Sequence, residues 1–225
     1  MLAEGEAQSP EFFGRLLQER APAFDLALPD DVRERLSRFL AELDVARRRT
    51  NLTGPVTAEE LVDHVLESAY GEKLIPHGAR VIDIGSGAGF PGIPLAVLRP
   101  DILVTPVEPR RKRREFLLEA SERVGIANLA PPEKTLGSLD SDVANVATMR
   151  AVGSVERVLG KARFLQPGGL FLAWTTNARL LSRRLLPVFA LEGELPVPES
   201  RRKAIASFRK QSVPRGTRRE DLDRG

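Results

Sequence analysis

The sequence feature that most constrains the fold is a glycine-rich stretch, VIDIGSGAGFPG, at residues 81–92. A short apolar run ends at Asp83, and an apolar segment begins at Pro91; three glycines fall within five residues between them, Gly85, Gly87 and Gly89. Glycine is needed where the backbone takes a positive φ or where a ligand comes close to it. The order predicts a strand, a tight turn and a helix, which is the first βα unit of an open α/β sheet.

The spacing of these glycines favours one class of cofactor. Phe90 stands where the dinucleotide motif G-x-G-x-x-G would place its third glycine. That glycine lets a helix pack closely on the strand and brings a pyrophosphate to the helix N-terminus. Its replacement favours a nucleoside cofactor without phosphates, S-adenosylmethionine above all. The motif alone is also compatible with an ordinary glycine turn in an unrelated α/β protein.

Composition limits the remaining possibilities. The chain has 225 residues, of which 42% are hydrophobic, and this suits one domain with a small appendage. It has no cysteine, which excludes disulfides and thiolate metal sites, and only His64 and His77 supply imidazoles. No apolar run approaches the roughly 20 residues that a membrane-spanning helix needs. We therefore expect a cytoplasmic protein with no metal site and no membrane partner.

The positive charge is unevenly distributed. The net charge is only +3, but the last 25 residues hold nine Lys or Arg and three acidic residues. Two further basic runs occur at Arg47–Arg49 and Arg110–Arg114. Such runs favour a polyanionic partner such as RNA, although each is also compatible with a solvated helix face.

Periodicity divides the chain into three parts. We expect an N-terminal helical extension at 1–75, a sheet domain at 76–215 and a disordered tail at 216–225. The extension should hold helices at 11–20, at about 29–46 with Asp30 or Asp31 as its cap, and after a capping box at Thr57–Glu60. Strands are expected at 81–84, 102–107, 126–130, 143–149, 170–174, 188–195 and 204–208, and helices at 93–98, 109–124, 155–164 and 177–186. Alternation of strands and helices predicts a mostly parallel, doubly wound sheet that closes with an antiparallel edge hairpin. Pro106 is awkward in a central strand.

Ligands of such sheets bind beyond the carboxyl ends of the strands. The glycine turn and the acid after the second strand therefore predict cofactor contacts at Asp83, Gly85, Gly87, Gly89 and Glu108. Glu108 lies 23 residues after Gly85, where an acid can bind ribose hydroxyls. Leu136 and Gly137 follow the third predicted strand and would frame an adenine, and Arg150 follows the fourth. Glu108 could also be an ordinary surface acid, and Arg150 an ordinary ion-pair partner.

Longer motifs around these residues are typical of one family. The segment DIGSGAGFPGIPL at 83–95 ends in FPGIPL, which is far more specific than the glycines. Further motifs are NLT at 51–53, LVDHVLES at 61–68, KRREFL at 112–117 and Arg150-Ala151. On these residues the chain, from about 30 to 210, resembles the 16S ribosomal RNA guanine-N7 methyltransferase family, once called glucose-inhibited division protein B.

The resemblance implies a fold, a reaction and roles for individual residues. The fold is a Rossmann-like S-adenosylmethionine-dependent methyltransferase fold, expected here as a mostly parallel seven-stranded sheet with an antiparallel edge strand. The reaction is methyl transfer to guanine N7 of 16S rRNA, free or in a precursor of the small ribosomal subunit, and we expect a monomer. Cofactor contacts are implied at Gly85, Phe90, Leu136, Gly137 and Arg150. Arg150 and Arg202 are the catalytic candidates, with Arg202 on the RNA side. Guanine N7 has a free lone pair and loses no proton on attack, so alignment and charge stabilisation would suffice.

The chain departs from the family pattern at four places. Gly137-Ser138 replaces an acidic position, Asn145 replaces an Asp, and Trp174–Thr176 lacks a lysine usual after the fifth strand. Arg47-Arg48 replaces Asn-Lys. His64 matches a family histidine but is also compatible with a packed helix residue, and Trp174 is expected in the core or a pocket wall. Three other readings stay open: a methyltransferase with another acceptor, a non-catalytic RNA-binding assembly factor, and, more remotely, a nicotinamide-dependent oxidoreductase.

Overall fold

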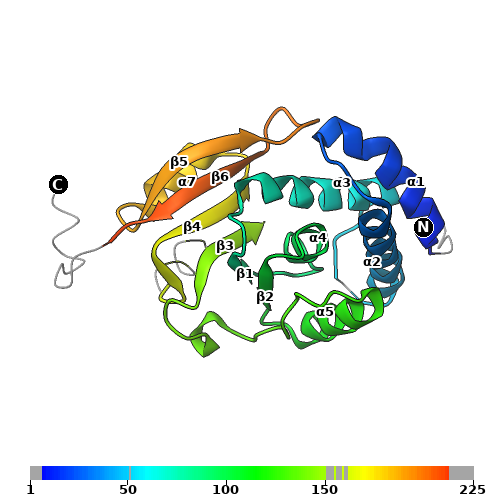
Figure 1. Ribbon diagram of the computed structural model, residues 1–225, viewed down its shortest axis with the longest axis horizontal. Coiled ribbons are helices and arrows are strands. Elements are labelled where there is room, and N and C mark those ends of the chain that lie inside the picture. The colour runs from blue at the N-terminus through cyan, green and yellow to red at the C-terminus, as the bar shows by residue number, and fades with distance from the viewer. Residues whose placement is uncertain (1–6, 51, 151–154, 156–158, 160–161, 213–225) are drawn as a thin grey trace.

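The computed structural model describes residues 7–50, 52–150, 155, 159 and 162–212 (Figure 1). Within them, six strands form one sheet in the order β2-β1-β3-β4-β6-β5. Strands β1 to β4 are parallel, and β6 is antiparallel to both of its neighbours. The strands are β1 Arg80–Ile84, β2 Leu103–Val107, β3 Ala144–Arg150, β4 Leu165–Thr175, β5 Phe189–Pro196 and β6 Ala204–Lys210.

One of the seven predicted strands, at 126–130, is reduced to a single isolated bridge. The segment expected as a strand at 126–130 pairs with β2 only at Leu129, opposite Val104, and again farther on at Glu133, opposite Val107. Pro131 and Pro132 lie between these bridges and have no N–H to donate, so a regular ladder cannot form there. The expected antiparallel hairpin is confirmed as β5–β6, but its antiparallel member, β6, lies inside the sheet and β5 forms the edge.

Pro106 fits into β2 because of the direction in which its nitrogen points. Val104 donates to Asn128 O and accepts from Ala130 N, so even-numbered residues of β2 direct their backbone polar groups away from β1. Pro106 shares that orientation and accepts a hydrogen bond from Glu133 N. Its missing N–H therefore costs β2 no hydrogen bond to β1.

The predicted helices are confirmed in number and position where the structure describes them. They are α1 Pro10–Arg20, α2 Asp30–Arg49, α3 Ala58–Ala69, α4 Gly92–Leu98, α5 Arg111–Val124 and α7 Ala178–Leu185. Thr57 and Glu60 form the predicted capping box of α3. The predicted cap of α2 is wrong: Pro29 occupies the N-cap, and Asp30 and Asp31 lie in the first turn, where they pair with Arg33 and Arg35. The helix predicted at 155–164 lies mostly outside the described residues.

Helices cover both faces of the sheet, as a doubly wound architecture requires. On one face, residues of α1 to α5 pack with sheet residues such as Val81 and Leu172 into one core. On the other, Phe171, Phe189 and Phe208 pack with Ala178 and Leu185 of α7. The helical extension thus shares its core with the sheet, and the predicted boundary at residue 75 separates elements packed together. The predicted tail at 216–225 lies outside the described residues.

This topology brings the carboxyl ends of β1, β2, β3 and β4 to one edge of the sheet, the place where the predicted site residues should meet. No helix in the described part of the chain is long and apolar enough to cross a membrane.

Candidate active site

The turn after β1 has the backbone that its glycines predict. Gly85, Gly87 and Gly89 have φ values of +71°, +56° and +101°. Residues other than glycine rarely adopt such φ values, so the shape of the turn depends on these three glycines. The N–H of Gly85 donates to Val107 O at 2.8 Å, which joins the turn to the end of β2.

Asp83 braces this turn from the buried side. Its side chain is 0% exposed; Thr148 Oγ1 donates to its Oδ1 at 2.9 Å, and the N–H of Gly92 donates to its Oδ2 at 3.2 Å. Asp83 and Thr148 meet because they are register partners on β1 and β3. Burial raises the pKa of Asp83 to about 6, against the lowering effect of the hydrogen bonds from Thr148, Ser86 and Gly92. The structure therefore places this predicted cofactor ligand beneath the turn, where it shapes the backbone.

Glu108 closes the turn from the β2 side. The N–H of Gly87 donates to its Oε2 at 3.0 Å, and the N–H of Arg110 donates to its Oε1 at 2.9 Å. Each oxygen thus accepts one backbone hydrogen bond and keeps a lone pair, and a carboxylate can accept about four hydrogen bonds in all. Glu108 is 3% exposed.

Arg113 adds an unsatisfied donor beside the same turn. Its buried Nε–H has no hydrogen-bond partner among the described residues. Its Nη1 lies 3.9 Å from Glu108 Oε2, and a Cβ on Gly87 would stand 3.5 Å from that nitrogen. A glycine cradle, a carboxylate with spare lone pairs and an orphaned buried donor together fit a polar nucleoside ligand.

Phe90 connects this turn to the next part of the site. Its ring packs edge-on against Phe39 and His64, at centroid distances of 5.7 and 5.8 Å. The guanidinium carbon of Arg150 lies 5.8 Å from the ring centroid. The residue that replaces the third Rossmann glycine therefore touches the predicted catalytic arginine.

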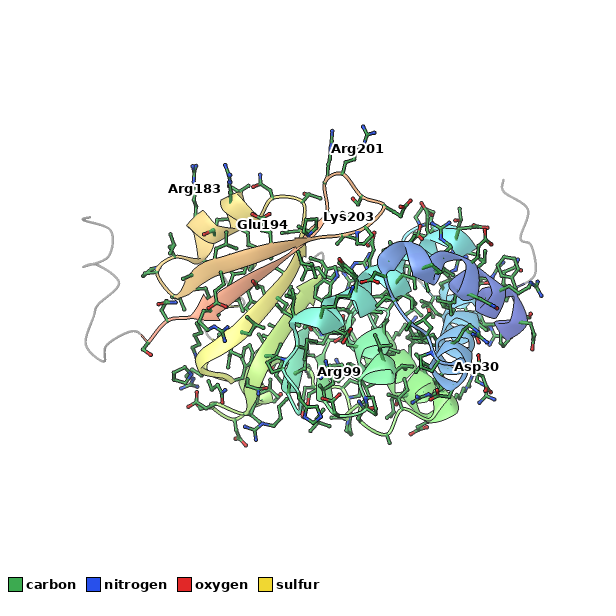
Figure 2. All side chains as sticks on the ribbon, turned by 45° about the horizontal axis from the view of Figure 1, so that its top comes forward. Asp30, Arg99, Arg183, Glu194, Arg201 and Lys203 are labelled. Atoms are coloured by element: carbon green, nitrogen blue, oxygen red, sulfur yellow. The ribbon has the colours of Figure 1, made fainter. Side chains whose placement is uncertain are left out.

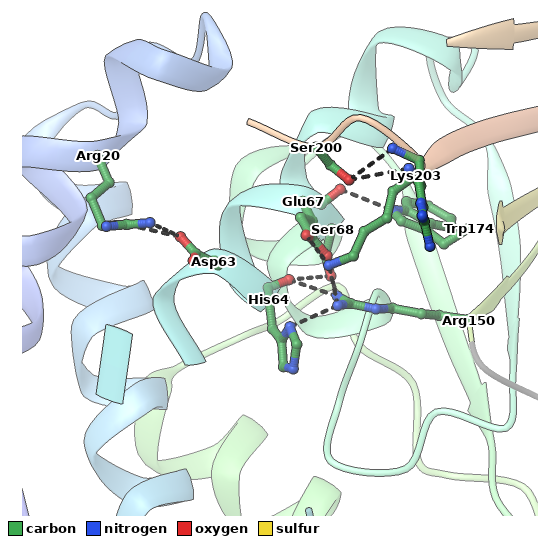
Figure 3. Close-up of polar contacts among 10 residues, drawn as sticks. Arg20, Asp63, His64, Glu67, Ser68, Arg150, Trp174, Ser200 and Lys203 are labelled. Atoms are coloured by element: carbon green, nitrogen blue, oxygen red, sulfur yellow. Dashed lines mark hydrogen bonds and ion pairs between the residues drawn. The ribbon is translucent and has the colours of Figure 1, made fainter. Parts of the chain in front are cut away.

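Arg150, at the end of β3, is held by one face of α3 (Figure 3). Its Nη1 donates to His64 O at 3.0 Å and to Ser68 Oγ at 3.1 Å; its Nη2 donates to Glu67 Oε2 at 2.8 Å and meets His64 Nδ1 at 2.7 Å. These four bonds use all four hydrogens on the terminal nitrogens, which leaves the Nε–H for a ligand. Burial lowers the pKa of Arg150, and Glu67 opposes this shift.

His64 is neutral in this cluster. Burial, and then the positive charges of Arg150 and Lys203, lower its pKa to about 4. Because the guanidinium can only donate, Nδ1 must accept, and the ring proton lies on Nε2. His64 thus packs on α3 and also orients Arg150.

A cavity of about 520 Å³ opens beside this cluster, at the ends of β3 and β4. Its lining includes Arg150, Glu67, Trp174, Thr175, Thr176 and Lys203. Trp174 pairs with Arg150 across β3 and β4, and its indole N–H donates to Glu67 O at 2.8 Å. Trp174 therefore forms part of the cavity wall, as predicted.

Lys203 is a charged cavity residue to which the sequence analysis gave no role in the site. It arrives from the turn between β5 and β6, and its Nζ donates to Glu67 Oε1 at 2.5 Å. Glu67, whose side chain is 7% exposed, thereby bridges Lys203 and Arg150. Its ammonium group shares the cavity wall with Trp174–Thr176, the segment that lacks the family lysine. A separation of 136 residues between Lys203 and Glu67 leaves no local pattern that could have revealed it.

Other predicted site residues lie farther from these contacts. Leu136 packs partly into the second core beside an exposed Gly137, and the segment is joined to the site by Glu108 N donating to Glu133 O at 2.9 Å. Arg202 is exposed beside Lys203. Asn145, another departure from the family, accepts from Arg80 N at the opposite end of the sheet. Asn51 lies outside the described residues. No group of three or more metal-binding side chains is found in the described part of the chain.

The sequence of this chain is similar to those of known proteins. Residues 32–180 match the sequence model of the GidB family, described as rRNA small subunit methyltransferase G. A "Ribosomal RNA small subunit methyltransferase G" of Mycobacterium sp. (strain JLS) is 34% identical over 178 residues, which are 75% of this chain and 70% of the relative. A protein of the same name from Thermobifida fusca is 39% identical over 63% of this chain and 60% of its own length. A solved SAM-dependent methyltransferase from Aquifex aeolicus superposes with a TM-score of 0.53 at 14% identity, over 65% of this chain and 92% of that one, which shows a shared fold.

Proposed function

Because this chain belongs to the rRNA small subunit methyltransferase G family, we propose that it transfers a methyl group from S-adenosylmethionine to N7 of a guanine in 16S rRNA. The observation that carries the proposal is the position of Arg150. This arginine touches the glycine turn through Phe90 on one side and lines the cavity on the other. The glycine turn, where we place the cofactor, and the cavity, where we place the acceptor base, therefore both adjoin the side chain of Arg150.

S-adenosylmethionine, the predicted cofactor, supplies an electrophilic methyl group on a positively charged sulfur. Glu108 is suited to accept hydrogen bonds from ribose hydroxyls through its remaining lone pairs, and the turn at Gly85–Gly89 lets the ligand approach the backbone. Asp83 holds the shape of that turn. Leu136 and Gly137 would contact the adenine end.

The acceptor side needs alignment more than acid–base chemistry. The N7 lone pair of guanine forms the new bond to carbon, and no proton leaves the base, so no general base is required. Arg150 presents its Nε–H to guanine O6 while α3 holds its other donors in place. A donor held in this way stabilises a reacting group without first having to reorganise. Glu67 balances the charges of Arg150 and Lys203, which keeps both cations in the cavity wall.

We further propose that the enzyme acts as a monomer in the cytoplasm, on 16S rRNA or on a precursor of the small subunit, with Arg202 on the RNA side of the cavity. Its exposed position on the turn before β6 supports that placement.

The test is nucleoside analysis by mass spectrometry of unmethylated 16S rRNA after incubation with the protein and methyl-labelled S-adenosylmethionine. Label in 7-methylguanosine is expected from the wild type. Arg150→Lys, which loses the planar fork, should lower methyl transfer about a hundredfold, while cofactor affinity changes little. Lys112→Gln, an exposed change on α5, serves as the control and should keep full activity. Label in another nucleoside would assign a different acceptor, and RNA binding without cofactor binding would make the protein a non-catalytic factor.

A further inference from the structure

Most arginines of the two short basic runs, at 47–49 and 110–114, have partners within the protein. Asp44, which is 0% exposed, accepts from both Arg47 and Arg48, at 2.7 and 3.1 Å. On α5, Arg114 donates to Glu108 O and Pro109 O, and Arg111 pairs with Glu115 at 3.2 Å. These guanidinium groups support local structure, so they are poorly placed to neutralise an outside anion.

A second set of arginines has no such partners. Arg179 and Arg183 on α7, and Arg201 and Arg202 on the turn between β5 and β6, are all exposed, and none bonds to a carboxylate of a described residue. We call these four residues the arginine rim. Arg183 and Arg201 project outward from the same side of the molecule, where Lys203 lies beneath Arg201 and Glu194 lies between Arg183 and Lys203 (Figure 2). Residues 176–203 contain six Lys or Arg and three acidic residues, of which Glu192 pairs with Arg209 and Glu194 and Glu199 are exposed.

The rim lies on two elements that line the cavity. Leu180, Leu181 and Arg184 of α7 and Lys203 of the β5–β6 turn are lining residues, and the rim arginines adjoin them in the sequence. Arg179 and Arg183 are four residues apart on α7 and therefore share one helix face. Leu180, which is 46% exposed, adds an apolar surface at the cavity mouth.

From this arrangement we propose that the arginine rim binds the phosphates of the RNA strand whose base enters the cavity. This inference rests on the proposed function and names the surface by which the substrate is held. A base cannot enter the cavity unless its own sugar–phosphate backbone passes the mouth, where the rim lies. The guanidinium fork matches phosphate oxygens in pairs, and unpaired exposed arginines lose no internal ion pair on binding. The rim, and neither of the two basic runs, thus supplies the electrostatic part of RNA affinity.

The test compares two variants that remove the same charge. Arg179→Gln/Arg183→Gln removes half of the rim, and Arg15→Gln/Arg49→Gln removes two exposed arginines from α1 and α2. RNA affinity is measured by filter binding with an unmethylated 16S rRNA transcript at several salt concentrations, and methylation is assayed separately. The rim variant should make the negative slope of log K against log salt shallower by about 1.4, since each lost contact to single-stranded RNA contributes about 0.7. The control should keep the wild-type slope, and both variants should bind S-adenosylmethionine normally.

Equal slopes for the two variants would overturn the rim, even if the wild type methylates the RNA. If the wild type leaves 16S rRNA unmethylated while the rim variant alone loses the salt-dependent affinity, the rim stands as an RNA-binding surface and the proposed methylation fails. The two ideas therefore fail separately.

Discussion

At the scale of single residues, the site is built from charged groups that are paired before any ligand arrives. Arg150 has its four terminal hydrogens committed to α3, and Glu67 is shared by Arg150 and Lys203. Burying these paired charges costs free energy of desolvation, but the hydrogen bonds fix each donor in a single orientation. The sequence predicts Arg150 from its place after a strand, but it cannot predict which donors remain available.

The bond between Thr148 and Asp83 should be strong because its acceptor is a buried carboxylate. Thr148→Val removes the donor to Oδ1 with little change in shape, and we expect it to lower the free energy of unfolding by about 1–3 kcal/mol. Urea unfolding measures this directly. Thr105→Val, on β2 at the other side of β1, is the control with the same chemical change. A loss no larger than in the control would mean that Asp83 does not depend on Thr148.

His64 should make stability depend on pH in a defined direction. Its pKa falls from 6.5 to about 4 on folding, so between these values the unfolded chain holds a proton that the native state lacks. Stability relative to His64→Gln should therefore fall as the pH drops from 6.5 to 4, by up to about 1.4 kcal/mol per pH unit. Asp83, whose pKa rises to about 6, acts in the opposite direction between 3.8 and 6, which is why the variant is needed as reference.

Two measurements check this expectation. Unfolding by urea at pH 7, 6 and 5 compares the wild type with His64→Gln. NMR titration of His77→Gln, which leaves His64 as the only imidazole, follows the ring itself. A ring that gains its proton near pH 6.5 would contradict the neutral, Nε2-protonated state.

At the scale of elements, the packing of the turn after α3 on β4 fixes the wall of the cavity. A Cβ on Gly71 would stand 2.5 Å from Trp174 Cζ2, closer than any real contact allows. We expect Gly71→Ala to displace the indole, to break its bond to Glu67 O and to cost about 1–3 kcal/mol. Trp174 is the only tryptophan, so its fluorescence emission reports the displacement. Gly54→Ala, with open space around its Cβ, should leave emission and stability unchanged. An unshifted emission in Gly71→Ala would contradict the expected displacement.

The elements themselves were largely predictable, and the errors have local causes. The helices and all strands but one follow from apolar periodicity, glycine turns and the capping box at Thr57. The prediction of a strand at 126–130 was wrong because Pro131 and Pro132 cannot donate to a ladder, although the segment still pairs with β2 at Leu129. The cap of α2 failed because Pro29 can begin a helix without a side-chain cap when two aspartates follow in the first turn.

At the scale of the whole molecule, the comparisons with known proteins confirm the family and the Rossmann-like methyltransferase fold that the sequence motifs predicted. The sequence was a poorer guide to which basic residues are paired within the protein and which are exposed. Asp44 lies three and four residues before Arg47 and Arg48, a spacing that indicates internal pairing on a helix. The grouping of Arg179 and Arg183 with Arg201 depends on the sheet order that places α7 near the β5–β6 turn, and no linear pattern contains it.

The ring of Phe90 has one more consequence, which concerns linkage between the two ligands. Phe90 directly follows the glycine turn in the chain, and its ring contacts the guanidinium and imidazole of the acceptor side, so the binding of each ligand should change the affinity for the other. By thermodynamic reciprocity, the factor by which bound RNA changes the affinity for S-adenosylhomocysteine must equal the factor by which bound S-adenosylhomocysteine changes the affinity for RNA. Calorimetric titrations in both orders measure this factor, and Phe90→Leu should bring it close to one. A factor unchanged in Phe90→Leu would show that the two ligands communicate by another path.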